Sequence, residues 1–204
     1  MSVDEKAYQS QSVTRLRDGQ CQDGEDQVAQ EIAVALVFNG IAFAVMMASP
    51  TALDDFAYGF AFSEGIIDHA AQIYDVETNL SAQGYTLDIT IAAACFARLK
   101  DKKRQLAGRT GCGLCGVESL AQAIRQPAPV LSNLTLHAKA ISSAIAAMRE
   151  RQILLQATGS SHAAAWCSAD GTVQVVREDV GRHNALDKVI GACLRKGIDP
   201  SQGF

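Results

Sequence analysis

The sequence predicts a mixed α/β fold, of α+β type, without the regular strand–helix–strand alternation of a doubly wound sheet. Three stretches support this prediction. Residues 31–47 have the pattern of a β-hairpin, "SPTALDDFAYGFAFSEGII" has helical spacing, and residues 162–179 have the pattern of a second strand pair.

The first hairpin pattern is "EIAVALVFNGIAFAVMM". Apolar residues occupy every second position on both sides of Asn39-Gly40, as expected for two strands with one buried face. Asn-Gly accepts the positive φ angles of a two-residue type I′ turn, so these two residues are expected to join the strands.

A helix is expected next. Leu53, Phe56 and Phe60 follow helical spacing, Ser49 or Thr51 can provide the N-cap, and Gly65 ends the pattern. Residues 73–78 and 85–92 are then expected to form two more strands, since apolar residues alternate in the second of them.

The second half of the chain is expected to contain three helices and three strands. Two of the helices are expected over 117–125 and over 136–149, where Leu136 and Ile145 belong to an apolar stripe. The last helix is expected to have Asn184 as its N-cap, to end at Gly197 and to carry Leu186 on its buried stripe. The strands are "ILLQATG" and the two strands of "HAAAWCSADGTVQVVRED", which an Asp-Gly turn joins.

Composition is that of an ordinary globular protein: 204 residues, 48% hydrophobic, formal net charge -4. No apolar run has the length of a membrane span, and the slight acidity gives no general footprint for nucleic acid. We expect a cytoplasmic protein with a frayed, disordered polar tail at 1–24, an N-terminal α/β subdomain at 25–105 and a second domain at 106–204.

Two cysteines, Cys112 and Cys115, lie in the glycine-rich stretch "GRTGCGLCGVESL" behind a basic segment. A zinc site would need further ligands at short spacing, but there is one C-x-x-C pair and the four histidines are scattered. No His or Cys has Glu two residues later, which argues against a deaminase-type zinc centre. A thioredoxin-like dithiol stays possible but lacks the preceding strand.

The third interpretation is a nucleophilic thiol that carries a group. Arg109 and other cations favour the thiolate of Cys112, as does the N-terminus of the helix expected from Val117, and the glycines leave the sulfur accessible. The chain has six cysteines, and we expect reduced thiols. Cys95 and Cys167 in apolar strand context and Cys193 on a helix stripe fit core residues, and Cys21 lies in the tail.

Two polar loops carry candidate binding residues. Loops that lead from strands into helix N-termini are where α/β proteins hold anionic ligands. The alternative is that Glu178 and Asp179 form surface ion pairs with Arg177 and Arg182 while Asn184 only caps a helix. The candidates are Thr158, Gly159 and His162 in "ATGSSHAAAW", and Arg177, Glu178, Asp179, Arg182, His183 and Asn184 in "VREDVGRHNALDK".

Several stretches together resemble the FdhD family, the sulfurtransferases needed for formate dehydrogenase activity. They are "RTGCGLCG", "TGSSHAAA", "LDDFAYGFAFSEGII" and, most specifically, "REDVGRHNALDKVIG". The resemblance runs in order from about residue 31 to the C-terminus.

The resemblance implies a cytidine-deaminase-like core after a smaller N-terminal part, and a homodimer. It implies a sulfurtransferase that takes persulfide sulfur from a cysteine desulfurase and passes it to the molybdenum or tungsten of a bis(molybdopterin guanine dinucleotide) cofactor, for the formate dehydrogenase apo-enzyme. Cys112 matches the persulfide carrier and Cys115 the second cysteine of the family's pair, which helps to release the sulfur or protects the loop as a disulfide. GDP or GMP would mimic the cofactor, and no metal of its own is expected.

Two expectations qualify this assignment. Family members continue past "DPSQGF" with a cofactor-binding segment that has no counterpart here, so the cofactor site is expected to be incomplete. The rival function is a non-catalytic chaperone that binds the nucleotide-bearing cofactor and docks it to the apo-enzyme, with cysteines that only steady a loop.

Overall fold

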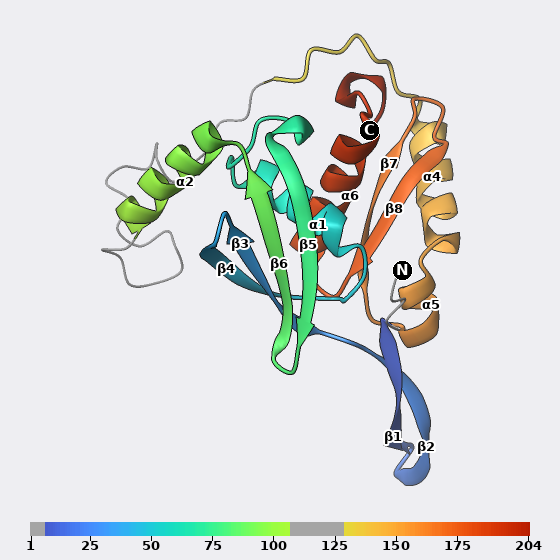
Figure 1. The fold of residues 1–204 in the computed structure, drawn as a ribbon. Coiled ribbons are helices and arrows are strands. Elements are labelled where there is room, and N and C mark those ends of the chain that lie inside the picture. Colours follow the sequence, from blue (N-terminus) through green and yellow to red (C-terminus); the bar gives the residue numbers. More distant parts are fainter. Residues whose placement is uncertain (1–6, 107–128) are drawn as a thin grey trace.

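The computed structural model describes residues 7–106 and 129–204 (Figure 1). Their fold is mixed α/β, as the sequence predicts. A four-stranded sheet of order β4-β3-β6-β5 and a separate two-stranded sheet, β7-β8, lie on either side of a pair of helices, α1 and α6. The site residues described below lie where these helices meet the second sheet.

The four-stranded sheet combines both predicted strand pairs. β3 (Ile32–Phe38) and β4 (Ile41–Ala48) form the expected hairpin, and Asn39 and Gly40 have the positive φ angles of 46° and 78° that its turn requires. β5 (Ile73–Ser81) follows the short 3₁₀ turn η1 (Ala70–Gln72) and pairs antiparallel with β6 (Gly84–Ile91). β6 runs parallel to β3, so the sheet is mixed.

The main core lies between this sheet and α1 (Leu53–Ser63). Phe56 and Phe60 of α1 pack with Phe38 and Phe43 of the sheet through edge-to-face ring contacts. α1 ends near Gly65 as predicted, with that glycine at φ 66°. The predicted side-chain cap is wrong, because the N-cap is Ala52 and the Ser49 hydroxyl accepts a hydrogen bond from the Val180 amide instead.

α2 (Ala93–Leu106) completes the described part of the first half of the chain. Cys95 is buried as expected, but it lies on this helix and not in a strand. The helix begins directly after β6, and its first turns bury Cys95 and Leu99 against the main core.

Residues 8–24 correct the prediction of a disordered tail over 1–24, whose first six residues lie outside the described part of the chain. β1 (Tyr8–Arg17) and β2 (Gln20–Ala29) pair along their whole length and project from the rest of the fold (Figure 1). Asp18-Gly19 makes the turn at φ 53° and 79°, and the hydroxyl of Thr14 donates to Asp23 at 2.7 Å across the strands. The sequence analysis did not predict this hairpin, because neither strand has the alternating apolar residues that indicate a buried face.

In the second half, residues 129–204 contain the predicted strand pair β7 (His162–Cys167) and β8 (Val173–Asp179), together with three helices. α6 (Arg182–Lys196) packs on both strands, and α4 (Ala138–Glu150) and α5 (Ile153–Thr158) lie on their other side (Figure 1). The 3₁₀ turn η2 (Pro200–Gln202) follows α6. The predicted end of α6 is confirmed, because Gly197 caps it at φ 63°.

Three details of this half differ from the predictions. "ILLQATG" is the helix α5 and not a strand, and α6 begins at Arg182 with Gly181 as N-cap, so Asn184 lies inside the helix. α4 buries Ala140 and Ala144 and α6 buries Val189 as expected, whereas three other apolar side chains predicted on the buried stripes are exposed. These exposed residues are Leu136, Ile145 and Leu186.

The two halves of the chain meet at α1 and α6, which cross at glycines. A Cβ on Gly59 would overlap the carbonyl of Asp187, and a Cβ on Gly191 would overlap the carbonyl of Asp55. Neither glycine has room for a side chain, so the helix axes approach closely there. The predicted subdomains are therefore packed against each other.

Candidate functional site

The cysteine segment is not part of the structural description. Cys112, Cys115 and Arg109, as well as the helix expected over 117–125, lie outside the described residues. The remaining predicted site residues all lie around one end of the β7–β8 pair, which we call the β8–α6 corner: residues 158–162 and 177–184.

Strand pairing brings the two predicted loops together at this corner. His162, the first residue of β7, lies opposite Asp179, the last residue of β8, and Ala163 lies opposite Glu178. The loop that enters β7 and the turn that leaves β8 are therefore neighbours, although about 20 residues separate them in the sequence.

Glu178 holds the N-terminus of α5. Its two carboxylate oxygens accept hydrogen bonds from the amides of Leu154 and Leu155, both at 2.9 Å, and one of them also accepts from the Ser161 hydroxyl at 2.9 Å. These are the free donors that a helix leaves at its start. The Glu178 carboxylate on β8 thus accepts hydrogen bonds from the free amides at the start of α5, which stabilises "ILLQATG" as a helix.

Thr158 and Gly159 shape the loop before β7. The Thr158 hydroxyl donates to the Leu154 carbonyl at 2.8 Å and accepts from the Ser160 amide at 3.1 Å. Gly159 ends α5 at φ 66°, is exposed, and has open space around its Cα. His162 is exposed at the start of β7. Thr158 serves the loop, whereas Gly159 and His162 face solvent.

Arg177 is engaged in an ion pair with α1. Its Nη2 and Nε lie 2.6 and 2.8 Å from the same carboxylate oxygen of Asp55, whose other oxygen lies 2.6 Å from Arg195 Nη1. The predicted alternative of surface pairs within the 177–182 stretch is wrong for this residue, because its partner comes from the other half of the chain. Arg177 joins β8 to α1.

Asp179 is the centre of a buried polar network. Its carboxylate and the ammonium of Lys188 are both fully buried and lie 2.6 Å apart. The same carboxylate accepts hydrogen bonds from the Ser49 and Gly181 amides and from Asn184 Nδ2, at 3.0, 2.8 and 3.1 Å. No buried side-chain nitrogen or oxygen in residues 7–106 and 129–204 lacks a partner.

Ser49 and Asn184 extend this network to the end of β4. Asn184 Nδ2 also donates to the Met47 carbonyl at 2.8 Å, and Lys188 donates to the Ser49 carbonyl at 2.9 Å. Burial lowers the pKa of Lys188, against the raising effect of Asp179. The network fixes the turn between β8 and α6.

Arg182 and His183 are the exposed residues of the corner. Within the described parts of the chain, neither side chain has a hydrogen bond or ion pair, and the amides of Arg182, His183 and Asn184 donate to no acceptor. Three free amides, a guanidinium and an imidazole therefore surround the start of a 15-residue helix. Such an arrangement favours anions.

Three residues outside the β8–α6 corner contact it in ways that the sequence analysis did not predict: Ser49, Asp55 and Lys188. Lys188 lies in "VREDVGRHNALDK", where its charge suggests a surface residue, and Asp55 lies in the helical pattern near 53–60. Their partners are 9 and 122 residues away in sequence. Only the period of α6, which places Lys188 on the same face as Asn184, could have indicated an inward lysine.

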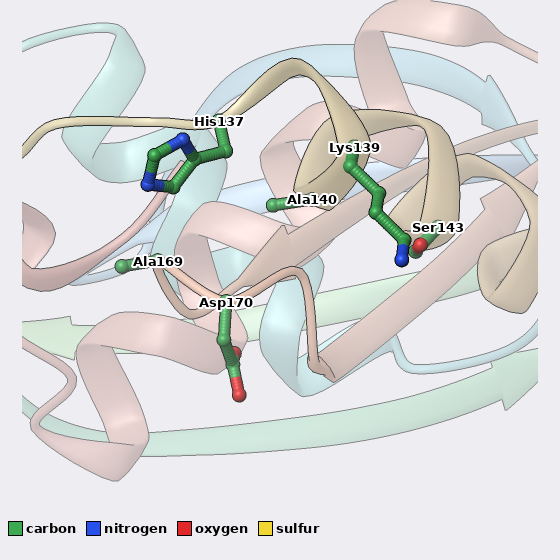
Figure 2. Close-up of a pocket in the computed structure, with 6 residues that line it drawn as sticks. All are labelled: His137, Lys139, Ala140, Ser143, Ala169 and Asp170. Carbon is green, nitrogen blue, oxygen red and sulfur yellow. The ribbon is translucent and has the colours of Figure 1, made fainter.

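A shallow pocket of about 410 Å³ lies at the opposite end of the β7–β8 pair (Figure 2). His137, Lys139 and Ser143 come from the start of α4, and Asp170 comes from the turn between the strands. Asp170 is held by Ser168 and Thr172 of its own turn. The pocket shares no residue with the β8–α6 corner.

The described cysteines fit structural roles or stand apart from the site. Cys95 and Cys167 are buried, Cys193 is partly buried and Cys21 is exposed on β2. Burial raises the pKa of the Cys167 and Cys193 thiols, which disfavours their thiolates at neutral pH.

Residues 7–106 and 129–204 contain no group of three or more His, Cys, Asp or Glu side chains arranged to hold a metal ion. None of their helices combines the length and the apolar character of a membrane span.

The chain is similar to several proteins that share one name. The chain is 53% identical over 192 residues to a protein named Sulfur carrier protein FdhD from Cupriavidus necator, covering 94% of this chain and 67% of that protein. A protein of the same name from Chromobacterium violaceum is 49% identical over 203 residues, covering 98% of this chain and 75% of the relative.

A crystal structure of a protein described as a formate dehydrogenase accessory protein, from Desulfotalea psychrophila, has the same fold. Its TM-score is 0.68 at 24% identity, with 96% of this chain and 71% of that chain covered. The model of the FdhD/NarQ family matches residues 29–204. The chain belongs to the FdhD/NarQ family.

Proposed function

We propose that this protein is a sulfur carrier that passes persulfide sulfur from a cysteine desulfurase to the molybdenum or tungsten cofactor of formate dehydrogenase. The observation that carries the proposal is the identity of about half of all residues, over nearly the whole chain, with proteins named as sulfur carriers. The family match and the fold of the accessory protein from Desulfotalea psychrophila support it.

Cys112 is the proposed carrier. In the loading step its thiolate attacks the outer sulfur of the donor's persulfide, the S–S bond of the donor breaks, and the donor's cysteine leaves as a thiolate. One S–S bond is exchanged for another, so no external oxidant or reductant is needed. Arg109 and the basic residues before it favour the thiolate, and Cys115 helps to release the sulfur or protects the loop.

The β8–α6 corner is the proposed binding surface for the guanine nucleotide part of the cofactor. Gly159, His162, Arg182 and His183 are exposed there and free to meet a ligand, with the open amides of α6 beside them. The other predicted binding residues form the frame that holds these groups in place. The frame consists of Thr158, Arg177, Glu178, Asp179 and Asn184.

The proposed partners are a cysteine desulfurase as donor, the formate dehydrogenase apo-enzyme as client and a second copy of this chain in a homodimer. A cytidine-deaminase-like core for residues 106–204 is part of the same proposal. The cofactor is cargo in this scheme, so the chain needs to bind it reversibly and not to keep it.

The loading step is tested by incubation with a cysteine desulfurase and cysteine, followed by mapping of added sulfur by mass spectrometry. We expect a gain of about 32 Da, one sulfur atom, on the peptide that contains Cys112, because its thiolate is the acceptor. Cys112→Ala should abolish the gain and Cys21→Ala, which removes an exposed cysteine on β2, should not. A gain at Cys193 or Cys95 in place of Cys112 would contradict the assignment.

The rival function, a cofactor chaperone without sulfur chemistry, makes a different prediction for the client enzyme. The double variant Cys112→Ala/Cys115→Ala keeps the β8–α6 corner intact, so a chaperone would still support formate dehydrogenase activity in cells that lack the native protein. A sulfur carrier would lose that support. The same variant should still bind GDP, which separates lost chemistry from lost folding.

A further inference from the structure

The Asp179–Lys188 pair sits directly behind the proposed anion surface. Both side chains have no exposed area, and the Nζ–Oδ2 distance is 2.6 Å. A buried pair loses hydration on both partners and often gives no net stability over apolar residues of similar size. Because the Asp179–Lys188 pair lies directly behind the proposed anion surface, we ask what it does for that surface besides stabilising the fold.

Asp179 places a negative charge at the start of α6. Its Oδ1 accepts the hydrogen bond from the amide of Gly181, the N-cap residue, and another from Asn184 in the first turn. A carboxylate at a helix N-terminus takes up the positive end of the helix dipole. Without compensation, it would oppose a second anion that binds to the same turn.

Lys188 provides the compensation from inside the fold. It follows Asn184 by one helical turn, and it bonds only to Asp179 and to the Ser49 carbonyl. The lysine is too deeply buried to touch a ligand. Its charge offsets that of Asp179, so this carboxylate does not cancel the positive potential of the exposed Arg182 and of the free amides at the surface. His183 is partly balanced by the nearby carboxylate of Asp187.

We propose that Lys188 is a positioning residue that keeps the β8–α6 corner receptive to anions, by neutralising and holding the carboxylate of Asp179. The proposal rests on the proposed function, in which this corner binds the phosphates of a guanine nucleotide. In this proposal Lys188 does not contact the nucleotide. It affects binding by holding Asp179 in place and by offsetting its negative charge.

The first test compares GDP and GMP binding to the full chain by isothermal titration calorimetry. Lys188→Met should weaken GDP binding by about tenfold, since it leaves one uncompensated charge close to the phosphates. The loss should be smaller for GMP, which carries less charge, and should shrink as salt is raised. Lys196→Met removes an exposed lysine from the other end of α6 and should change the GDP affinity by less than about twofold.

The second test is rescue by a charge-neutral pair. Asp179→Asn/Lys188→Met removes both charges, and Asn can still accept from the Gly181 amide. GDP affinity should return to within about threefold of wild type. Circular dichroism and thermal melts show that each variant is folded at the temperature of the titration. If Lys188→Met alone does not fold, the double variant decides: a folded double variant that binds about tenfold weaker than wild type overturns the proposal.

Two other outcomes separate this inference from the function on which it rests. Wild type that binds neither GDP nor GMP contradicts the nucleotide surface itself, and the role of Lys188 falls with it. Wild type that binds GDP while Lys188→Met binds equally well, or loses GMP and GDP by the same factor at all salt concentrations, contradicts only the role of Lys188.

Discussion

Arg177 and Asp55 join the two halves of the chain through a buried carboxylate. Arg177 on β8 places two nitrogens within 2.8 Å of one oxygen of Asp55 on α1, and Arg195 of α6 binds the other oxygen. The Asp55 side chain is 6% exposed and that of Arg177 is 27% exposed. Three elements thus share one negative charge.

Removing that carboxylate should destabilise the whole fold. Asp55→Ala removes the carboxylate partner of Arg177 and one of the two carboxylate partners of Arg195, and we expect a loss of about 2–3 kcal/mol in the free energy of unfolding. Urea denaturation measures this loss. The control is Asp54→Ala, since Asp54 is half exposed and lies 3.3 Å from Arg195, and it should cost less than about 1 kcal/mol. Equal effects of the two variants would show that Asp55 is not the bridging group.

At the crossing of α1 and α6, replacing a glycine by alanine should lower the free energy of unfolding, which is the opposite of the usual effect inside a helix. Alanine normally stabilises a helix interior by up to about 1 kcal/mol relative to glycine. Gly59→Ala and Gly191→Ala should instead destabilise by about 2 kcal/mol or more, because the added methyl overlaps a backbone carbonyl of the other helix. Thermal and urea unfolding measure the change. Ser142→Ala on the exposed side of α4 serves as control and should stay within about 0.5 kcal/mol.

Glu178 should control the local stability of α5. Glu178→Gln replaces a carboxylate that accepts from the Leu154 and Leu155 amides. We expect α5 to open more readily, with about tenfold faster hydrogen exchange at these amides and little change in α6. Exchange measured by NMR tests this. Glu150→Gln, an exposed residue at the end of α4, should leave the exchange of both amides unchanged.

The sequence predicts those elements whose determinants are local. Asn39-Gly40 sets the turn between β3 and β4, and Gly197 ends α6, because a positive φ angle needs only the residue itself. α5 has such a determinant only at its end, where Gly159 has a φ angle of 66°; at its start, the N-cap residue Gln152 makes no side-chain cap hydrogen bond. The conformation of α5 depends on Glu178, 23 and 24 residues further along the chain.

The candidate site follows the same division. The signature strings identify which loops form the corner, and the exposed positions of His162, Arg182 and His183 agree with a binding role. The inward direction of Asp179 and Lys188 could not be predicted, since their partner Ser49 lies 130 residues before Asp179 and no sequence pattern links the two. From sequence alone, a charged residue is expected at the surface, because most charged residues are exposed. Whether a particular one is buried depends on tertiary packing.

We expect Asp187 to make the stability of the protein depend on pH. Burial raises the pKa of this carboxyl, while the Ser63 hydroxyl at 2.6 Å partly counters the shift. A carboxyl with a raised pKa in the folded state contributes stability that is fully present below its unfolded pKa, near 3.8, and that is lost as the pH rises through the folded pKa. At neutral pH the charge of this half-buried carboxylate is therefore unfavourable.

Asp187→Asn should accordingly be more stable than wild type at pH 7, and the difference should diminish towards pH 4, where wild type becomes protonated. Carboxyl carbon shifts in an NMR titration provide the direct check. Asp187 should titrate at higher pH than Asp170, because the hydrogen bond from the Thr172 amide lowers the pKa of Asp170. If Asp187 titrates below Asp170, or if Asp187→Asn is less stable at pH 7 than at pH 4 relative to wild type, the carboxyl is not penalised by burial in the folded protein.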